Sequence, residues 1–242
     1  MERYSTPGVE RRSILCYIIS MVRKTPFING EYYHVFNRGV NRRNIFLNTS
    51  DYKRFLDTIK YYSFSNHDLK FSRYLKISYD KQIEHFNNLE NKLINIVAFV
   101  LMPNHFHFIL RQTEENGISN FLRLFQNSYT KYFNTKHKRT GHLLQGQFKA
   151  VLVDNDSYLL HLSRYIHLNP LTSFIVKSIS DLEVYPWSSY PSYLNQNTQF
   201  SSLVDIKIVS NQFDKAEDYR FFVNERSEYQ QNLDLLKHLL LE

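Results

Sequence analysis

Cysteine is almost absent from this sequence of 242 residues, in which Cys16 is the single example. One thiol excludes a disulfide framework and a zinc site built from cysteines, and it favours a reducing, cytoplasmic environment. Glycine is also scarce, with 6 residues where average usage would give about 17. This scarcity disfavours glycine-rich nucleotide-binding folds and collagen-like or linker-type chains.

Long hydrophobic runs are missing as well. The longest apolar run near the start covers residues 14–19, whereas a membrane-spanning helix needs about 20 apolar residues. No basic segment, longer apolar stretch and small-residue cleavage site follow one another as in a signal peptide. We therefore expect no membrane partner, and we treat residues 1–25 as a leader of uncertain role.

What the sequence has in excess is positive charge and aromatic side chains. Its 30 Lys and Arg against 23 Asp and Glu give a formal net charge of +7 and a pI near 9.3. Such a surplus is compatible with a phosphate-rich partner. Aromatic residues make up 16% of the chain, with 18 Tyr and 19 Phe. Some of these rings could stack on unpaired bases, although most must lie in the core.

The pattern of apolar and turn-forming residues predicts an α+β domain over residues 26–195. Clusters of β-branched and aromatic residues predict strands over residues 31–37, 95–102, 105–111 and 148–153. Helical spacing of apolar residues predicts helices over residues 51–62 and 117–133, and from 156 or 157 to about 168. The order of the first six elements, βαββαβ, predicts a ferredoxin-like antiparallel sheet with helices on one face, plus one extra helix beside it.

The ends of these elements and the segments between them also carry predictions. Ser50-Asp51 is expected to cap the first helix, and Asn169-Pro170 is expected to end the last one. The polar residues 64–92 are interpreted as an insertion with a short helix. Residues 196–242 are expected to form a C-terminal extension that is helical from Ala216.

His105 and His107 are separated by one residue on a predicted strand. The two-residue period of a strand places both imidazoles on one face, with Cα atoms about 6.6 Å apart, directly after the turn at Pro103-Asn104. Two neutral imidazoles at this spacing can bind one divalent cation. A third ligand would have to come from elsewhere, as an oxygen or another histidine. The alternative is that both are surface histidines on a half-buried strand.

Two other classes of phosphate-handling enzyme are excluded because the sequence lacks residues that they need. A histidine-triad nucleotide hydrolase needs a third alternating histidine, and that position holds Ile109. Gly141 and Gly146 have the spacing of a phosphate-binding loop, but Gln147-Phe148 stand where that loop needs Lys and Ser or Thr. We therefore expect no nucleotide triphosphatase.

Tyr165 and Asn169 are four residues apart near the end of the last predicted helix. This spacing puts them on one helix face, about one turn from each other. Taken alone, the pair is better explained by a boundary aromatic and a helix-ending residue.

A set of motifs in fixed order resembles the single-tyrosine HUH transposases of bacterial insertion sequences, and most closely the REP-associated tyrosine transposases. The motifs are YHVFNRG (33–39), MPNHFH (102–107), GHLLQGQFK (141–149), YIHLNP (165–170) and PWSSY (186–190). The resemblance spans residues 33–194. It departs at Leu144 and Gln147, where family members often carry Trp and Arg.

The resemblance implies a function and roles for these residues. Residues 26–195 would form the HUH transposase domain, a metal-dependent DNA transposase that cleaves and rejoins single-stranded DNA through a covalent 5′-phosphotyrosine. Tyr165 would be the nucleophile, on the extra, catalytic helix. His105, His107 and Asn169 would hold the divalent metal, Mg²⁺ or Mn²⁺. The partner would be single-stranded DNA, hairpin-containing, bound by a monomer or a homodimer.

Basic residues near these motifs are candidates for DNA contacts, although such clusters are often only solvated surface. They are Arg38, Arg42 and Arg43 after the first strand, Lys131, Lys136, Lys138 and Arg139 after the second helix, and Lys149 in the fourth strand. Two rival functions stay open. One is a non-catalytic nucleic-acid-binding ferredoxin-like module, as in RNA-recognition domains. The other is a domesticated nuclease that processes chromosomal repeats.

Overall fold

The computed structural model of the protein describes residues 26–196, 198 and 201–225. The leader expected over residues 1–25 and the last part of the expected extension, residues 226–242, lie outside the described residues. No helix in the described ranges is long and apolar enough to cross a membrane.

The centre of the fold is a four-stranded antiparallel sheet with the order β2-β3-β1-β4. The strands are β1 (Tyr32–Arg38), β2 (Ile94–Met102), β3 (His105–Gln112) and β4 (Lys149–Val153). In chain order β1 is followed by α1, β2 and β3 by α4, and β4 closes the unit, which is the ferredoxin-like arrangement. The predicted fold class is confirmed.

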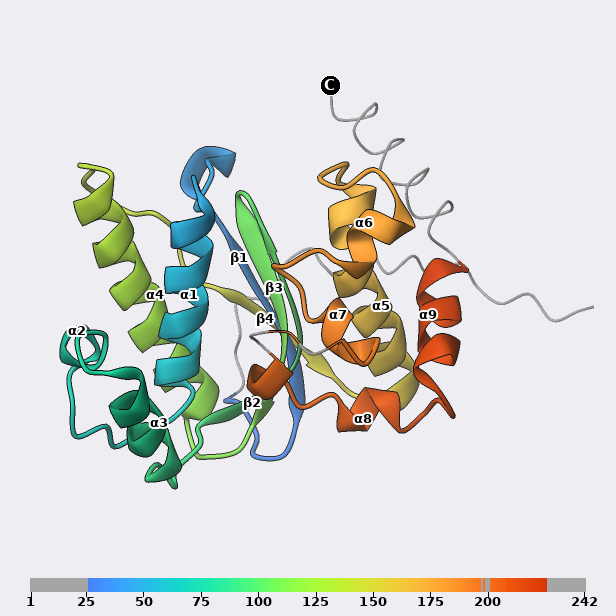
Figure 1. Ribbon diagram of the computed structural model, residues 1–242, viewed down its shortest axis with the longest axis horizontal. Coiled ribbons are helices and arrows are strands. Elements are labelled where there is room, and N and C mark those ends of the chain that lie inside the picture. Colours follow the sequence, from blue (N-terminus) through green and yellow to red (C-terminus); the bar gives the residue numbers. More distant parts are fainter. Residues whose placement is uncertain (1–25, 197, 199–200, 226–242) are drawn as a thin grey trace, which may run out of the picture.

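The helices of the ferredoxin-like unit, α1 (Thr49–Tyr62) and α4 (Gly117–Lys136), cover one face of the sheet (Figure 1). Between them and the sheet lies an apolar core to which every layer contributes, including Val35 of β1, Phe106 and Phe108 of β3, Phe55 of α1 and Phe125 of α4. Part of the aromatic excess of the sequence is used here, and these rings pack edge to face or tilted at centroid distances of 5.2 to 5.8 Å.

The opposite face of the sheet is covered by α5 (Asp156–Thr172), the helix that carries Tyr165 and Asn169 (Figure 1). A second apolar core joins α5 to the sheet through residues such as Val100, Ile109 and Ile166. Further short elements pack around α5. They are α6 (Ile179–Glu183), α7 (Tyr190–Tyr193), the 3-10 turn Ser201–Leu203, α8 (Lys207–Ser210) and α9 (Ala216–Asn224).

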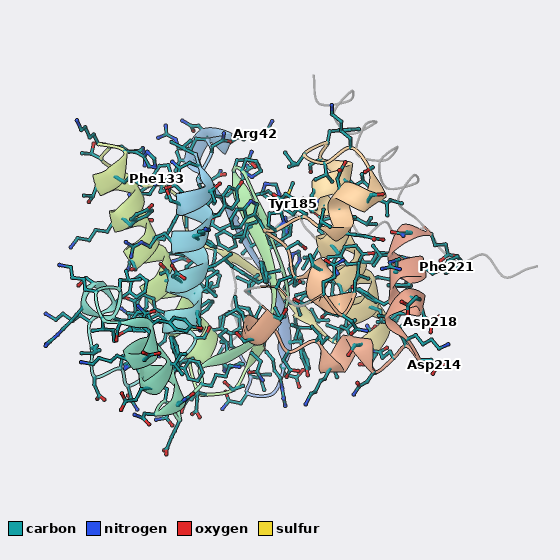
Figure 2. The ribbon with its side chains drawn as sticks, in the orientation of Figure 1. Arg42, Phe133, Tyr185, Asp214, Asp218 and Phe221 are labelled. Atoms are coloured by element: carbon teal, nitrogen blue, oxygen red, sulfur yellow. The ribbon has the colours of Figure 1, made fainter. Side chains whose placement is uncertain are left out.

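The segment from 185 to 188 ties the α5 side of the molecule to β2. Tyr185, labelled in Figure 2, donates its hydroxyl hydrogen bond to the carbonyl of Leu101 at 2.9 Å. The Leu101 amide in turn donates to the carbonyl of Trp187 at 2.8 Å, and the Trp187 ring stacks on Tyr52 with 4.6 Å between centroids. The outer edge of β2 is therefore paired along this stretch, which explains why the whole strand is buried or nearly so.

The insertion over residues 64–92 contains two short helices, α2 (Phe71–Tyr74) and α3 (Tyr79–Asn87). It packs through Phe71 and Tyr74 against Tyr61 at the end of α1. The prediction of one short helix was therefore correct in kind but missed the second. A 3-10 turn, Val40–Arg42, follows β1.

Two helix boundaries differ from the prediction. Asn48, and not Ser50 or Asp51, caps α1, because its side-chain oxygen accepts from the Asp51 amide. Asn155 caps α5 in the same way, one residue before the predicted positions. In both cases an asparagine just upstream satisfies the free amides of the first turn.

The predicted end of α5 was wrong, because the helix continues through Pro170 to Thr172. A proline lacks only its own N–H, so in the last turn it costs a single helical hydrogen bond, to the carbonyl of Ile166. The turn is closed by the Ser173 amide, which donates to the carbonyl of Asn169 at 3.0 Å. Asn169 therefore lies in regular helix, one turn after Tyr165.

Candidate active site

The pairing of β1 with β3 decides which side chains face α5. In this antiparallel register Arg38 lies opposite His105, and Phe36 lies opposite His107. Opposed residues share a face of the sheet, so all four point to the α5 side, while Phe106 points into the core under α1 and α4. The two histidines and the helix carrying Tyr165 are thus on the same side of the sheet.

His105 and Asn169 are brought together across the gap between β3 and α5. The Nε2 of His105 lies 3.4 Å from the Oδ1 of Asn169, and its Nδ1 lies 2.6 Å from the Oδ1 of Asn104. Both neighbours are carboxamide oxygens, which only accept, and a neutral imidazole carries one N–H; the shorter contact assigns this proton to Nδ1 and leaves Nε2 its lone pair. Two lone pairs, on His105 Nε2 and Asn169 Oδ1, therefore face the same point with no proton between them.

His107 is oriented by a residue that the sequence interpretation did not single out, His34 of β1. The Nε2 of His34 lies 2.9 Å from the Nδ1 of His107, and both rings are buried. When the Nδ1–H of His107 donates to His34, the Nε2 of His107 keeps its lone pair. A signal was available in the sequence, because His34 lies at strand spacing from Phe36 and Arg38, on the strand that a ferredoxin-like sheet places beside the His105 strand.

Tyr165 closes the site from the α5 side. Its ring stands edge-on to His107 with 5.7 Å between centroids, and edge-on to His34 with 6.4 Å. The ring is half-buried among the residues that join α5 to the sheet. One chain therefore supplies both histidines, the tyrosine and the carboxamide to a single site.

Burial keeps the imidazoles of this site neutral. Desolvation lowers the pKa of His105 to about 4; Asn169, which would accept a hydrogen bond from the protonated ring, acts in the opposite direction, and the nearby Arg38 cation lowers the pKa further. Desolvation also lowers the pKa of His34 to about 3 and brings the pKa of His107 well below its ordinary value. Neutral imidazoles are the form that binds metal ions.

The residues present fit a divalent cation. His105, His107 and Asn169 would supply two nitrogens and one oxygen, a mixed set that suits Mn²⁺ and, less strongly, Mg²⁺. No group of three His, Cys, Asp or Glu side chains among the described residues could hold a metal ion. A cation at this site would therefore depend on the carboxamide of Asn169 as its third ligand.

Four of the eight cations predicted to contact DNA lie on or near the same edge of the sheet, namely Arg38, Arg42, Arg43 and Lys149. Arg38 is opposite His105, and Lys149 of β4 is opposite Phe36, with its Nζ 6.0 Å from the Phe36 ring. Arg42, labelled at the upper edge in Figure 2, accepts at its carbonyl from the side chain of Asn104. These side chains give the entrance of the site a positive charge.

Gly39 allows the turn that holds Arg42 and Arg43 next to this entrance. A Cβ at Gly39 would lie 2.1 Å from the carbonyl oxygen of Arg43, so no other residue fits without moving the turn. The 141–147 loop holds the turn from outside, since the Val40 amide donates to Leu143 and the Gln145 amide to Arg38. The sequence motifs around residues 38–39 and 141–149 are thus parts of one structure.

Arg139 and Lys136 are placed differently from these four cations. Arg139 donates to the side chain of Asn134 and to the carbonyl of His142. Lys136, at the end of α4, lies in the helical layer on the other face of the sheet, where its Nζ is 2.7 Å from the Oδ1 of Asp51. Its contact with DNA stays a prediction, and its observed role is in this ion pair.

Asp51 is fully buried and receives hydrogen bonds from four groups, which are the Leu47 amide, Tyr132, Lys136 and His137. Burial alone would raise the pKa of this carboxyl, but these hydrogen bonds outweigh it and hold the pKa below the usual range. The carboxylate therefore stabilises the fold at neutral pH, and this contribution disappears as the pH falls through the lowered pKa.

We expect Asp51→Asn to lower the free energy of unfolding by about 2 kcal/mol at pH 7, allowing for the partial exposure of Lys136. The deficit should begin to shrink below about pH 4, where Asp51 of the unfolded chain binds a proton, and should disappear once the pH falls below the lowered pKa of the folded carboxyl. Urea unfolding at pH 7 and pH 3 measures both values. Asp57→Asn, an exposed position on the same helix, is the matched control, and an equal loss there would contradict the assignment.

Two further histidines of α5 are hydrogen-bonded away from the site. His167 is fully buried, with Nδ1 2.7 Å from the Tyr219 hydroxyl and Nε2 2.8 Å from the Ser189 hydroxyl, and desolvation lowers its pKa to about 3. His161 accepts at Nδ1 from Arg164 at 2.8 Å. His167 therefore anchors α9 and the 189 segment to α5, and it takes no part in the site.

The fold and the site combine two features. A ferredoxin-like sheet carries a histidine pair on a central strand, and a tyrosine and a carboxamide lie one turn apart on a helix packed over it. Residues 79–169 match the model of the family described as Transposase IS200 like. The match runs from α3 to Asn169 and thus includes the histidine pair and Tyr165, but not β1 with His34.

A solved structure has a similar fold. The chain is similar to one described as a REP-associated tyrosine transposase bound to a REP hairpin, with a TM-score of 0.51 and 20% sequence identity. The similarity covers 78% of this chain and 90% of that one. No curated protein matches the sequence. The predicted resemblance is confirmed by the family match in sequence and by this structure in fold.

Proposed function

We propose that the protein is a metal-dependent, single-tyrosine DNA transposase that cleaves and rejoins single-stranded DNA through a covalent 5′-phosphotyrosine. The observation that carries the proposal is that β3, with the histidine pair, and α5, with Tyr165 and Asn169, meet within one chain. The Nε2 of His105 and the Oδ1 of Asn169 lie 3.4 Å apart, and the ring of Tyr165 stands against His107. The family match over residues 79–169 supports the same reaction class.

The chemistry follows from what each residue presents. A divalent cation bound by His105, His107 and Asn169 would polarise the scissile phosphate and offset its negative charge in the transition state. The Oη of Tyr165 attacks phosphorus and loses its proton, while the bond from phosphorus to the 3′ oxygen of the preceding nucleotide breaks. The protein then carries the 5′ phosphate, and the released 3′ oxygen takes a proton.

The step exchanges one phosphodiester for another of similar energy. A 3′ hydroxyl can therefore attack the phosphotyrosine and restore a DNA backbone without a nucleotide triphosphate. This agrees with the sequence, in which Gln147-Phe148 stand where a phosphate-binding loop needs Lys and Ser or Thr. The positive side chains of Arg38, Lys149 and Arg42 at the entrance would hold the flanking phosphates.

The expected DNA partner is a single strand with a hairpin. The similar solved structure is described as bound to a REP hairpin, and we extend this to the present chain as part of the proposal. The rival function as an RNA-recognition-like module gains no support, because those modules bind bases on an open sheet face. Here α5 covers the corresponding face (Figure 1).

The test is to incubate the protein with labelled single-stranded hairpins and Mn²⁺, and to measure the protein mass. The expected result is a protein whose mass rises by that of the DNA fragment on the 3′ side of the cut, together with a free fragment that ends in a 3′ hydroxyl. Cleavage without a protein–DNA adduct, or an adduct that leaves a 5′ hydroxyl fragment, would overturn the proposal.

His34 gives a prediction about orientation of the metal ligand. His34→Phe keeps a planar aromatic ring at this position but leaves the Nδ1–H of His107 without an acceptor, so we expect the affinity for Mn²⁺ and the cleavage rate to fall about 10- to 100-fold. His34→Gln can still accept at its carboxamide oxygen and should retain most of both. Calorimetric titration with Mn²⁺ and circular dichroism separate this effect from misfolding. Equal losses in the two variants would show that His34 only packs.

A further inference from the structure

A groove of about 1000 Å³ lies on the side of the molecule away from the candidate active site. It is bounded by α1, α4 and the segment leading into α2, in the layer that covers the other face of the sheet (Figure 1). Neither the proposed chemistry nor the comparisons assign any role to it.

The lining of the groove carries charge of one sign. Its basic residues are Arg54, Lys70, Arg123, Lys131 and Lys136. Among the described residues that line it there is no Asp or Glu. Lys136 is paired with Asp51 behind the wall, whereas Lys70, Arg123 and Lys131 are exposed. A groove of this kind favours a polyanion over a neutral or cationic ligand.

The cations are arranged along a line. Arg123, Asn127, Lys131 and Thr135 all line the groove and follow one another at intervals of four residues on α4. Residues four apart share one face of a helix, so they form a polar stripe along its length. From residue 123 to residue 136 the helix rises about 20 Å, a length that can follow several successive phosphates of one strand.

Aromatic rings stand between these cations. Tyr132 is half-buried in the wall and has the guanidinium of Arg54 4.6 Å from its ring centre. Arg54 also lies over Phe71, at 5.5 Å, and Tyr62 lines the same wall. Exposed ring faces and guanidinium planes bind unpaired bases by stacking. A duplex keeps its bases stacked inside and would present only phosphates to such a wall.

We propose that this groove binds a single-stranded segment of the DNA substrate, away from the nucleotide that is cut. The proposal rests on the proposed function for the identity of its ligand, because it takes the bound strand to be continuous with the strand that Tyr165 attacks. The end of α4 at Lys136 is followed by the Arg139 turn, which packs on the 141–147 loop at the edge of the active site. A strand lying along α4 thus reaches the catalytic edge at that end.

The test uses the full chain without divalent metal, fluorescent single-stranded dT20 and a 20-base-pair duplex as probes. In the double variant Arg123→Glu/Lys131→Glu, we expect the affinity for dT20 to fall at least tenfold. The slope of log affinity against log salt should decrease by about 1.4, since each phosphate contact of a single strand contributes about 0.7. The affinity for the duplex should change much less than that for dT20.

The matched control is Lys81→Glu/Lys207→Glu, which changes the net charge by the same amount at exposed positions that do not line the groove. It should bind dT20 within twofold of the wild type. Equal losses in both double variants would reduce the effect to overall charge and overturn the proposal. An unchanged affinity for dT20, or an equal loss for the duplex, would also overturn it.

The two proposals fail in different measurements. The groove variant should still form the covalent adduct on a short hairpin that ends close to the cut, because Tyr165 and the histidine pair are unchanged. If the wild type forms no adduct while the groove variant loses dT20 binding, the groove proposal stands and the proposed function fails.

Discussion

Tyr165→Phe is expected to abolish the covalent protein–DNA adduct while leaving DNA binding nearly unchanged. The substitution removes one oxygen, and the remaining ring can keep its edge-on contacts with His107 and His34. Removal of a catalytic nucleophile costs about 10⁴- to 10⁶-fold in rate, which places the adduct below detection. Mass spectrometry measures the adduct, and fluorescence anisotropy measures the binding.

Tyr158→Phe is the matched control, because this tyrosine lies on the same helix and is also half-buried. It should form the adduct at the wild-type rate. A persistent adduct in the Tyr165→Phe variant would show that another tyrosine is the nucleophile, and peptide mapping would identify it. Tyr129 is a poor substitute, since it is fully buried on the other face of the sheet and donates to the carbonyl of Ile45.

Much of the fold was accessible from the sequence because its signals are local. The strand that begins at His105 is set by a turn at Pro103-Asn104, and the burial of β2 follows from its unbroken apolar run. The end of α5 was not accessible, since a proline in the last turn of a helix removes only its own hydrogen bond. The helix runs past Pro170 to Thr172, and the Ser173 amide still donates to the carbonyl of Asn169.

In the candidate site, too, the local features could be predicted from the sequence and the non-local ones could not. His105 and His107 are neighbours on one strand, and Tyr165 and Asn169 are neighbours on one helix, so each pair follows from local periodicity. That the two pairs meet depends on which face of the sheet α5 covers, and only the family resemblance pointed to this. The contact of His34 with His107 depends on the register between β1 and β3, which no local signal fixes. The groove along α4 requires the packing of the insertion against α1, which is equally non-local.

His105→Ala is expected to reduce metal-dependent cleavage about 10²- to 10³-fold, because it removes one of three proposed ligands and with it much of the charge stabilisation at the scissile phosphate. His105 is the more informative of the two histidines to change. It is only partly buried, whereas His107 is buried and hydrogen-bonded to His34. A loss of activity in His107→Ala would therefore mix ligand removal with disturbed packing.

The loss of cleavage in His105→Ala should arise from weaker binding of the metal. Mn²⁺ titration should show a weaker affinity in His105→Ala, and Asn169→Ala should show a similar change, since the two side chains face one point. The double variant should lose little more than either single one if they bind the same ion. His85→Ala, in α3 on the other face of the sheet, should cleave normally. Undiminished Mn²⁺-dependent cleavage by His105→Ala would rule out this metal site, and additive losses in the double variant would show that His105 and Asn169 act separately.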